Sequence, residues 1–188
     1  HCVADGSEVQ HADIVVLAVK PQVMMKVLDG LKGCAAYQCS EGAGPLFISI
    51  AAGLPTARLE EALPAGAHLV RVMPNLPLLV SQGATGVTAG ALASDDDVAL
   101  VQALFAALGT AVVVDEEVMD AVCAVSGSGP AYVAAMIESM RDAGAAAGLA
   151  PELAEELALQ TVYGTAKMIA QTDIGVEELR ISVCSPGG

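Results

Sequence analysis

The last four residues, Ser185-Pro-Gly-Gly188, are of types that could bind an anion. Successive glycines allow neighbouring backbone N–H groups to converge on one point, and such a concavity binds phosphate or carboxylate, more strongly where a helix begins. The same residues could instead simply end a helix. The sequence alone leaves both interpretations open.

Three further stretches follow runs that we expect to be strands: residues 18–21 (AVKP), 51–53 (AAG) and 72–77 (VMPNLP). Ligands of α/β sheets bind beyond the carboxyl ends of the strands, and small residues there let a cofactor approach the backbone. Lys20 supports two interpretations equally, a solvated lysine at a helix start or a cation for a phosphate-bearing ligand.

Two other features have structural explanations. Glu116 opens the helix expected after the last strand, where the helix dipole alone favours an acid, so the residues by themselves indicate a structural role. Two Ser-Gly pairs precede Pro130, and Ser128 would cap the helix that Pro130 begins. Packing against a neighbour explains these glycines at least as well as contact with a ligand.

Composition excludes several classes of function. The net charge of −14 disfavours nucleic acid and anionic membranes as partners. The five cysteines are odd in number and form no CxxC pair, which indicates reduced thiols and a reducing compartment. The three scattered histidines predict neither a metal site nor a Ser-His-Asp triad. Two uncharged stretches are long enough to consider as membrane spans, and we expect neither to be one. Residues 98–114 are of marginal length and are broken by Gly109-Thr110, and residues 72–94 are interrupted by proline, glycine and polar residues.

Apolar runs alternate with helical periodicity in the first part of the chain. The runs at residues 13–19, 46–51, 67–73 and 110–114 predict strands, the first two buried on both faces, and helices are expected at 22–31, 55–63 and 95–108. This alternation predicts an α/β class protein with a mostly parallel sheet covered on both sides. From Glu116 on, only helices are expected, at 116–125, 130–147, 151–171 and 176–183. The helix expected at 151–171 has almost no polar face, so it should be buried between subunits as well as within one. This predicts a helical dimerisation domain.

Six stretches, VQHADIVVLAVKP, SIAAGL, RVMPNLP, GATGVTAG, AVSGSGPAYV and SPGG, occur in the order and spacing of one family, and the chain resembles the pyrroline-5-carboxylate reductases. The resemblance implies a partial Rossmann-like NAD(P)-binding domain at residues 1–115 and a helical dimerisation and substrate-loop domain at 116–188. It further implies that 1-pyrroline-5-carboxylate is reduced to L-proline with NADPH or NADH, the last step of proline biosynthesis. The expected form is a homodimer or higher oligomer in the cytoplasm, with a mitochondrial location left open.

The resemblance also assigns site residues, and no metal is among the groups it implies. Contacts to NADP or NAD fall on Ala18, Val19, Lys20, Pro21, Ala52 and Ser182. Contacts to substrate fall on Glu116, the acid that approaches the substrate amine, and on Ser185, Gly187 and Gly188, whose loop would hold the carboxylate. The family threonine that bonds the substrate nitrogen comes after Gly188, so no catalytic residue is assigned within the chain.

The chain departs from the family pattern in three respects. The glycine-rich turn that seats the pyrophosphate corresponds to sequence before His1, further helices correspond to sequence after Gly188, and Asp5 and Ser182 stand where the family has asparagines. We therefore expect an internal piece with little activity of its own. A catalytically silent dimerisation or regulatory module is the alternative. Another dehydrogenase with a helical dimer domain is a third possibility, against which SPGG argues.

Overall fold

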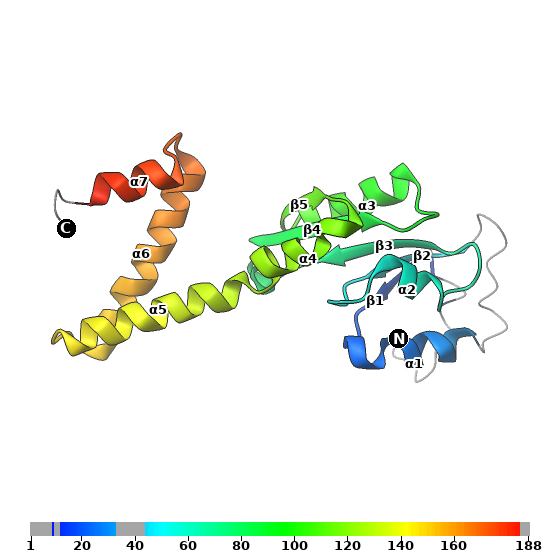
Figure 1. The fold of residues 1–188 in the computed structure, drawn as a ribbon, viewed down its shortest axis with the longest axis horizontal. Coiled ribbons are helices and arrows are strands. Elements are labelled where there is room, and N and C mark those ends of the chain that lie inside the picture. Colours follow the sequence, from blue (N-terminus) through cyan, green and yellow to red (C-terminus); the bar gives the residue numbers. More distant parts are fainter. Residues whose placement is uncertain (1–8, 10–11, 33–43, 185–188) are drawn as a thin grey trace. The chain divides into compact units, whose positions relative to one another are not determined.

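The computed structural model describes residue 9, residues 12–32 and residues 44–184 (Figure 1). Contacts divide the chain into two units, His1–Pro130 and Ala131–Gly188, which we call the sheet unit and the helical unit. Each unit is described by itself below.

In its described residues the sheet unit contains a five-stranded sheet in the order β1-β2-β3-β4-β5. Its strands are β1 (Ile14–Leu17), β2 (Leu46–Ser49), β3 (His68–Met73), β4 (Gly83–Ala89) and β5 (Gly109–Val113). The β1-β2, β2-β3 and β4-β5 pairs are parallel, whereas β3 and β4 are antiparallel. The helices between strands are α1 (Pro21–Lys32), α2 (Thr56–Glu60) and α3 (Asp95–Ala106). The predicted α/β class with a mostly parallel sheet is therefore confirmed.

Strand β4 is the element that the sequence analysis did not predict. A short 3-10 helix, η3 (Leu76–Val80), is the only helical element between β3 and β4. A parallel crossover needs a dozen or more residues, and residues 74–82 are too few, so the chain returns antiparallel to β3. Glycine and alanine in GATGVTA weaken the strand pattern that would have indicated β4.

Burial agrees with the prediction for β2 and differs for β1. All four residues of β2 are buried, since two core clusters lie on opposite faces of the sheet, one around Phe47 and the other around Ile48. In β1, Leu17 is buried but Val16 is 55% exposed. Strand β1 is at the edge of the described sheet, and α3 contacts mainly β3, β4 and β5. The prediction that the first strand is buried on both faces is therefore wrong.

Helix α3 begins with a capping box that also fixes strand β3. The Ser94 side chain accepts a hydrogen bond from Asp97 N–H, and Asp97 Oδ2 accepts one from Ser94 N–H at 2.8 Å. His68 Nδ1 lies 2.7 Å from the same Oδ2 atom. Burial raises the pKa of Asp97, but the hydrogen bonds from Ser94 and the bond and charge of His68 outweigh it, so the pKa is lower than usual.

The residues after β5 fold as three short pieces rather than the single helix predicted at 116–125. They are η4 (Glu116–Val118), α4 (Met119–Val122) and a π-helical turn η5 (Cys123–Gly127). They pack on the sheet, with Met119 fully buried, and a Cβ added to Gly86 of β4 would lie 2.8 Å from Val122 Cγ1. Contacts thus group residues 116–130 with the sheet unit, whereas the expected domain boundary lies between residues 115 and 116.

The helical unit contains α6 (Pro151–Gln171), α7 (Val176–Val183) and most of α5 (Gly129–Ala146). The predicted limits of the last two helices match the structure. A Cβ added to Gly144 would lie 3.1 Å from that of Ala154, so α5 and α6 approach each other at small residues. Within α6 only Ala154 and Ala158 are buried, while Leu157 is 51% exposed.

One stretch among the described residues, Glu116–Ala146, is long and apolar enough by composition to cross a membrane. A single stretch of this kind is weak support for a span. Its first part is divided into 3-10, α and π pieces that group with the sheet unit, and the most apolar part of the stretch is not buried within the described residues.

Candidate functional site

The first part of the candidate site is the edge where the parallel strands β1 and β2 end. Leu17, Ser49 and Arg71 are neighbours in the register of β1, β2 and β3, so the loops that follow the first two strands come side by side. Ala18, Lys20 and Ala52 are exposed there, and Val19 and Pro21 are partly exposed. Such an edge, with small side chains and one exposed lysine, fits the phosphates and ribose of a dinucleotide.

The second part is an ion pair between Arg71 of β3 and Glu116, where Arg71 Nη1 donates to Glu116 Oε1. The Arg71 side chain is 3% exposed and that of Glu116 is 28% exposed. Two other polar atoms of these side chains, Arg71 Nε and Glu116 Oε2, are buried and have no hydrogen-bond partner among the described residues. Buried polar atoms are normally paired, so this carboxylate retains capacity for another donor.

A third arrangement joins two of the motif stretches through Asn75. Its Oδ1 accepts from Ala84 N–H at 2.9 Å and its Nδ2 donates to the Ser126 carbonyl at 3.0 Å. A Cβ added to Gly127 would lie 2.5 Å from Met73 Cε, so the π-turn and the end of β3 are in close contact. These contacts support the structural interpretation of the first Ser-Gly pair.

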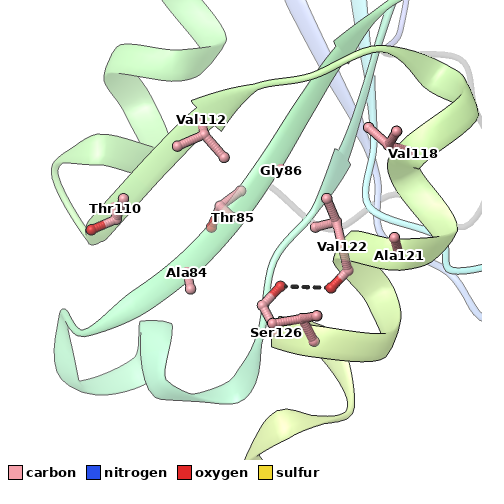
Figure 2. A pocket seen from close by; sticks show the side chains of 10 residues that line it. Ala84, Thr85, Gly86, Thr110, Val112, Val118, Ala121, Val122 and Ser126 are labelled. Carbon is pink, nitrogen blue, oxygen red and sulfur yellow. Dashed lines mark hydrogen bonds between the residues drawn. The ribbon is translucent and has the colours of Figure 1, made fainter. Parts of the chain in front are cut away.

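A cavity of about 360 Å³ lies between β4, β5 and α4 (Figure 2). Val112, Val118 and Ser126 are among its lining residues, and Ser126 Oγ donates to the Val122 carbonyl at 2.9 Å. None of the described residues that line the cavity is charged. It therefore lacks the cationic groups that an anionic substrate or a dinucleotide phosphate requires.

The remaining predicted site residues lie elsewhere. Ser182 is in α7 of the helical unit, where its Oγ donates to the Leu179 carbonyl at 2.8 Å. Ser185, Gly187 and Gly188 lie outside the described residues, as does Asp5. Of the predicted site residues, the structure describes Glu116 and the five residues at the sheet edge within the sheet unit. Their contacts with ligands stay predictions.

Two residues of interest, Arg71 and Asn75, were not singled out in the sequence analysis. The signal for Arg71 was present, because a single arginine stands inside the apolar strand HLVRVM. A charge in a strand covered on both faces requires a buried partner. The sequence did not indicate which acid this would be, since Glu116 is 45 residues away.

No group of three or more His, Cys, Asp or Glu residues suited to a metal ion occurs in the part of the chain that the structure describes. Cys123 and Cys184 are free thiols.

Comparison with known proteins gives consistent matches. Residues 116–188 match the family model for pyrroline-5-carboxylate reductase dimerisation. The chain is 43% identical over 180 residues to the pyrroline-5-carboxylate reductase of Methanosarcina acetivorans and 45% identical over 177 residues to that of Synechocystis. These alignments cover 96% and 94% of the chain but 64% and 63% of the two relatives, so the chain spans less than two thirds of their length.

A solved structure from Plasmodium falciparum, a pyrroline carboxylate reductase with NADP bound, superimposes with a TM-score of 0.88 at 36% identity. The alignment covers 99% of this chain and 69% of the other.

Proposed function

The chain belongs to the pyrroline-5-carboxylate reductase family, and we propose on this basis that the protein reduces 1-pyrroline-5-carboxylate to L-proline with NADPH or NADH. The observation that carries the proposal is the identity to curated reductases along nearly the whole chain. The sheet edge with its exposed small residues and Lys20 supports the cofactor assignment.

In this proposal the ligand contacts divide between the two units. Ala18, Val19, Lys20, Pro21 and Ala52 bind the dinucleotide at the sheet edge, and Ser182 contributes from the helical unit. Glu116 lies beside the ring nitrogen of the substrate. The terminal residues Ser185, Gly187 and Gly188 hold the substrate carboxylate through backbone N–H groups, in the manner of an anion-binding glycine loop.

The reaction requires positioning more than covalent chemistry from the protein. A cyclic imine that carries a proton on nitrogen already accepts hydride at carbon, and the nicotinamide supplies that hydride when it is bound. The chain's own residues then have three tasks, which are to orient the cofactor, to hold the carboxylate and to accept a hydrogen bond from the ring nitrogen. We assign the last task to Glu116, the acid with which η4 begins.

We further propose that the protein is a homodimer or higher oligomer in the cytoplasm. The exposed leucines of α6 support the proposed oligomer, because a helix with this many exposed apolar side chains is stabilised when another chain covers them. The match of residues 116–188 to a dimerisation family supports it independently.

The test is an assay of the protein expressed from its complete open reading frame. We expect oxidation of NADPH or NADH that depends on 1-pyrroline-5-carboxylate and yields proline. If the folded protein consumes neither nucleotide and binds neither, the proposal fails. The silent dimerisation or regulatory module would then be the better explanation.

A further inference from the structure

We propose that the cavity between β4, β5 and α4 receives an apolar side chain of a second copy of this chain, so that the subunit interface includes part of the sheet unit as well as the helical unit. The proposal rests on the proposed oligomer and goes beyond it, because it names a surface of the sheet unit as part of the interface.

The first argument is the chemistry of the cavity walls. Among the described residues that line the cavity, only Thr85, Thr110 and Ser126 have polar side chains, and none is charged. The Ser126 hydroxyl already donates its hydrogen to the Val122 carbonyl. A cavity of about 360 Å³ with so few polar groups has little means to orient a polar ligand, and it favours an apolar occupant.

The second argument is the exposure of the valines around the cavity. Val112 and Val118 are 47% and 46% exposed, and Val125 is 76% exposed. Figure 2 shows Val112 on β5 and Val118 on the helical segment across the cavity. A small molecule inside the cavity would leave much of Val125 in water, whereas a protein surface would cover the cavity and its surroundings together. Clustered exposed apolar residues of this kind mark sites of contact between proteins.

The third argument identifies the partner as a second copy. Val118, Val122 and Val125 lie within residues 116–188, the segment that matches the dimerisation family, and they belong to one wall of the cavity. The other wall, from β4 and β5, consists of residues before that segment. A second copy that contacts the first wall can therefore enter a cavity whose other wall belongs to the sheet.

The concave shape limits what can occupy the cavity. Two identical hollows cannot fill each other, so the occupant must project from a different surface of the second copy. A two-fold axis would then produce two equivalent contacts, one in the cavity of each chain. Leu153 and Leu157 of α6, both exposed, are apolar side chains of the required kind.

The experiment compares two adjacent valines of β5 in the full-length protein. Val112 lines the cavity, and Val113 is similarly exposed, at 51%, but lies on the other face of the sheet. We expect Val112→Glu to raise the dissociation constant of the dimer roughly 10- to 100-fold, because a charge enters the centre of an apolar contact. Val113→Glu should leave it within about twofold of the wild type. Analytical ultracentrifugation over a concentration series measures both.

Two further measurements keep the test independent of the added charge. Ala121→Phe fills the cavity with an apolar side chain and should weaken the dimer in the same direction as Val112→Glu. The photoreactive residue p-benzoylphenylalanine, placed at position 125, should give a cross-link between two copies on irradiation, and the same residue at position 113 is the control. Circular dichroism checks that each variant is folded.

Separate outcomes overturn the inference and the proposed function. An unchanged dimer in folded Val112→Glu, equal losses in the two valine variants, or no cross-link between copies from position 125 would remove this contact and leave the reductase assignment intact. A small molecule that native mass spectrometry finds on the wild type but not on Ala121→Phe, with the oligomer unchanged, would assign the cavity to a ligand instead. A wild-type protein that sediments as a single chain at every concentration would overturn the proposed oligomer together with this inference.

Discussion

Lys20 is the residue through which the cofactor proposal can be tested most directly. It is exposed directly after β1, and Lys26 is exposed on the following helix α1. If Lys20 contacts a cofactor phosphate, Lys20→Ala should raise KM for NADPH by roughly 10-fold, in keeping with loss of a charged hydrogen bond. Lys26→Ala serves as the matched control and should change KM little. Equal effects of the two variants in steady-state kinetics would show that Lys20 acts only through general surface charge.

Asp97 is the residue whose protonation should affect stability. Its folded-state pKa is lower than the ordinary value. The stabilisation is therefore present above the unfolded pKa of about 3.9 and is lost as the pH falls through the lower folded pKa. Asp97→Asn should cost about 1 kcal/mol in urea unfolding at pH 7, where the capping box is complete, and the deficit should shrink toward pH 2. Asp96→Asn, an exposed neighbour, is the control. A deficit independent of pH would rule out the carboxylate as its source.

At the scale of single elements, Asn75 connects three segments that the sequence separates. Its side chain links the residues after β3 to β4 and to the π-turn η5. We expect Asn75→Ala to lower the free energy of unfolding by about 2 kcal/mol, because two partly buried backbone groups lose their partners. Gln82→Ala, an exposed change in the same connection, should stay within about 0.5 kcal/mol of the wild type. Chemical denaturation of the two variants distinguishes these outcomes.

The elements show which parts of the fold the sequence could predict. Helices α6 and α7 have the predicted limits because Pro151 and Gly175 mark their starts and the apolar pattern is continuous. Strand β4 was missed because its glycines and alanine hide the alternation, and because its direction depends on the length of the preceding connection. The Arg71–Glu116 pair depends on how β3 and the turn after β5 come together, which no local pattern encodes.

For the whole molecule, the main expectation concerns assembly. Leu153 and Leu157 lie one turn apart on α6 and are 45% and 51% exposed. If a second chain covers them, Leu157→Glu should shift the protein to a smaller species in analytical ultracentrifugation. Glu156→Gln, at an exposed position on the same helix, should leave the sedimentation unchanged. An unchanged oligomer in Leu157→Glu would mean that this part of α6 is not an interface.

The reversal of direction at β4 has a kinetic consequence. Residues 74–82 separate β3 from β4, and every other strand pair of the described sheet is separated by a longer segment. Closing a short loop costs less entropy, so the β3-β4 hairpin should form early and the parallel pairs should add to it later. In pulse-labelling during refolding, the amides of Arg71 and Thr88, which face each other across β3 and β4, should gain protection before that of Val15, which faces β2. Strand β4, which the sequence pattern did not predict, would then belong to the hairpin that nucleates the sheet.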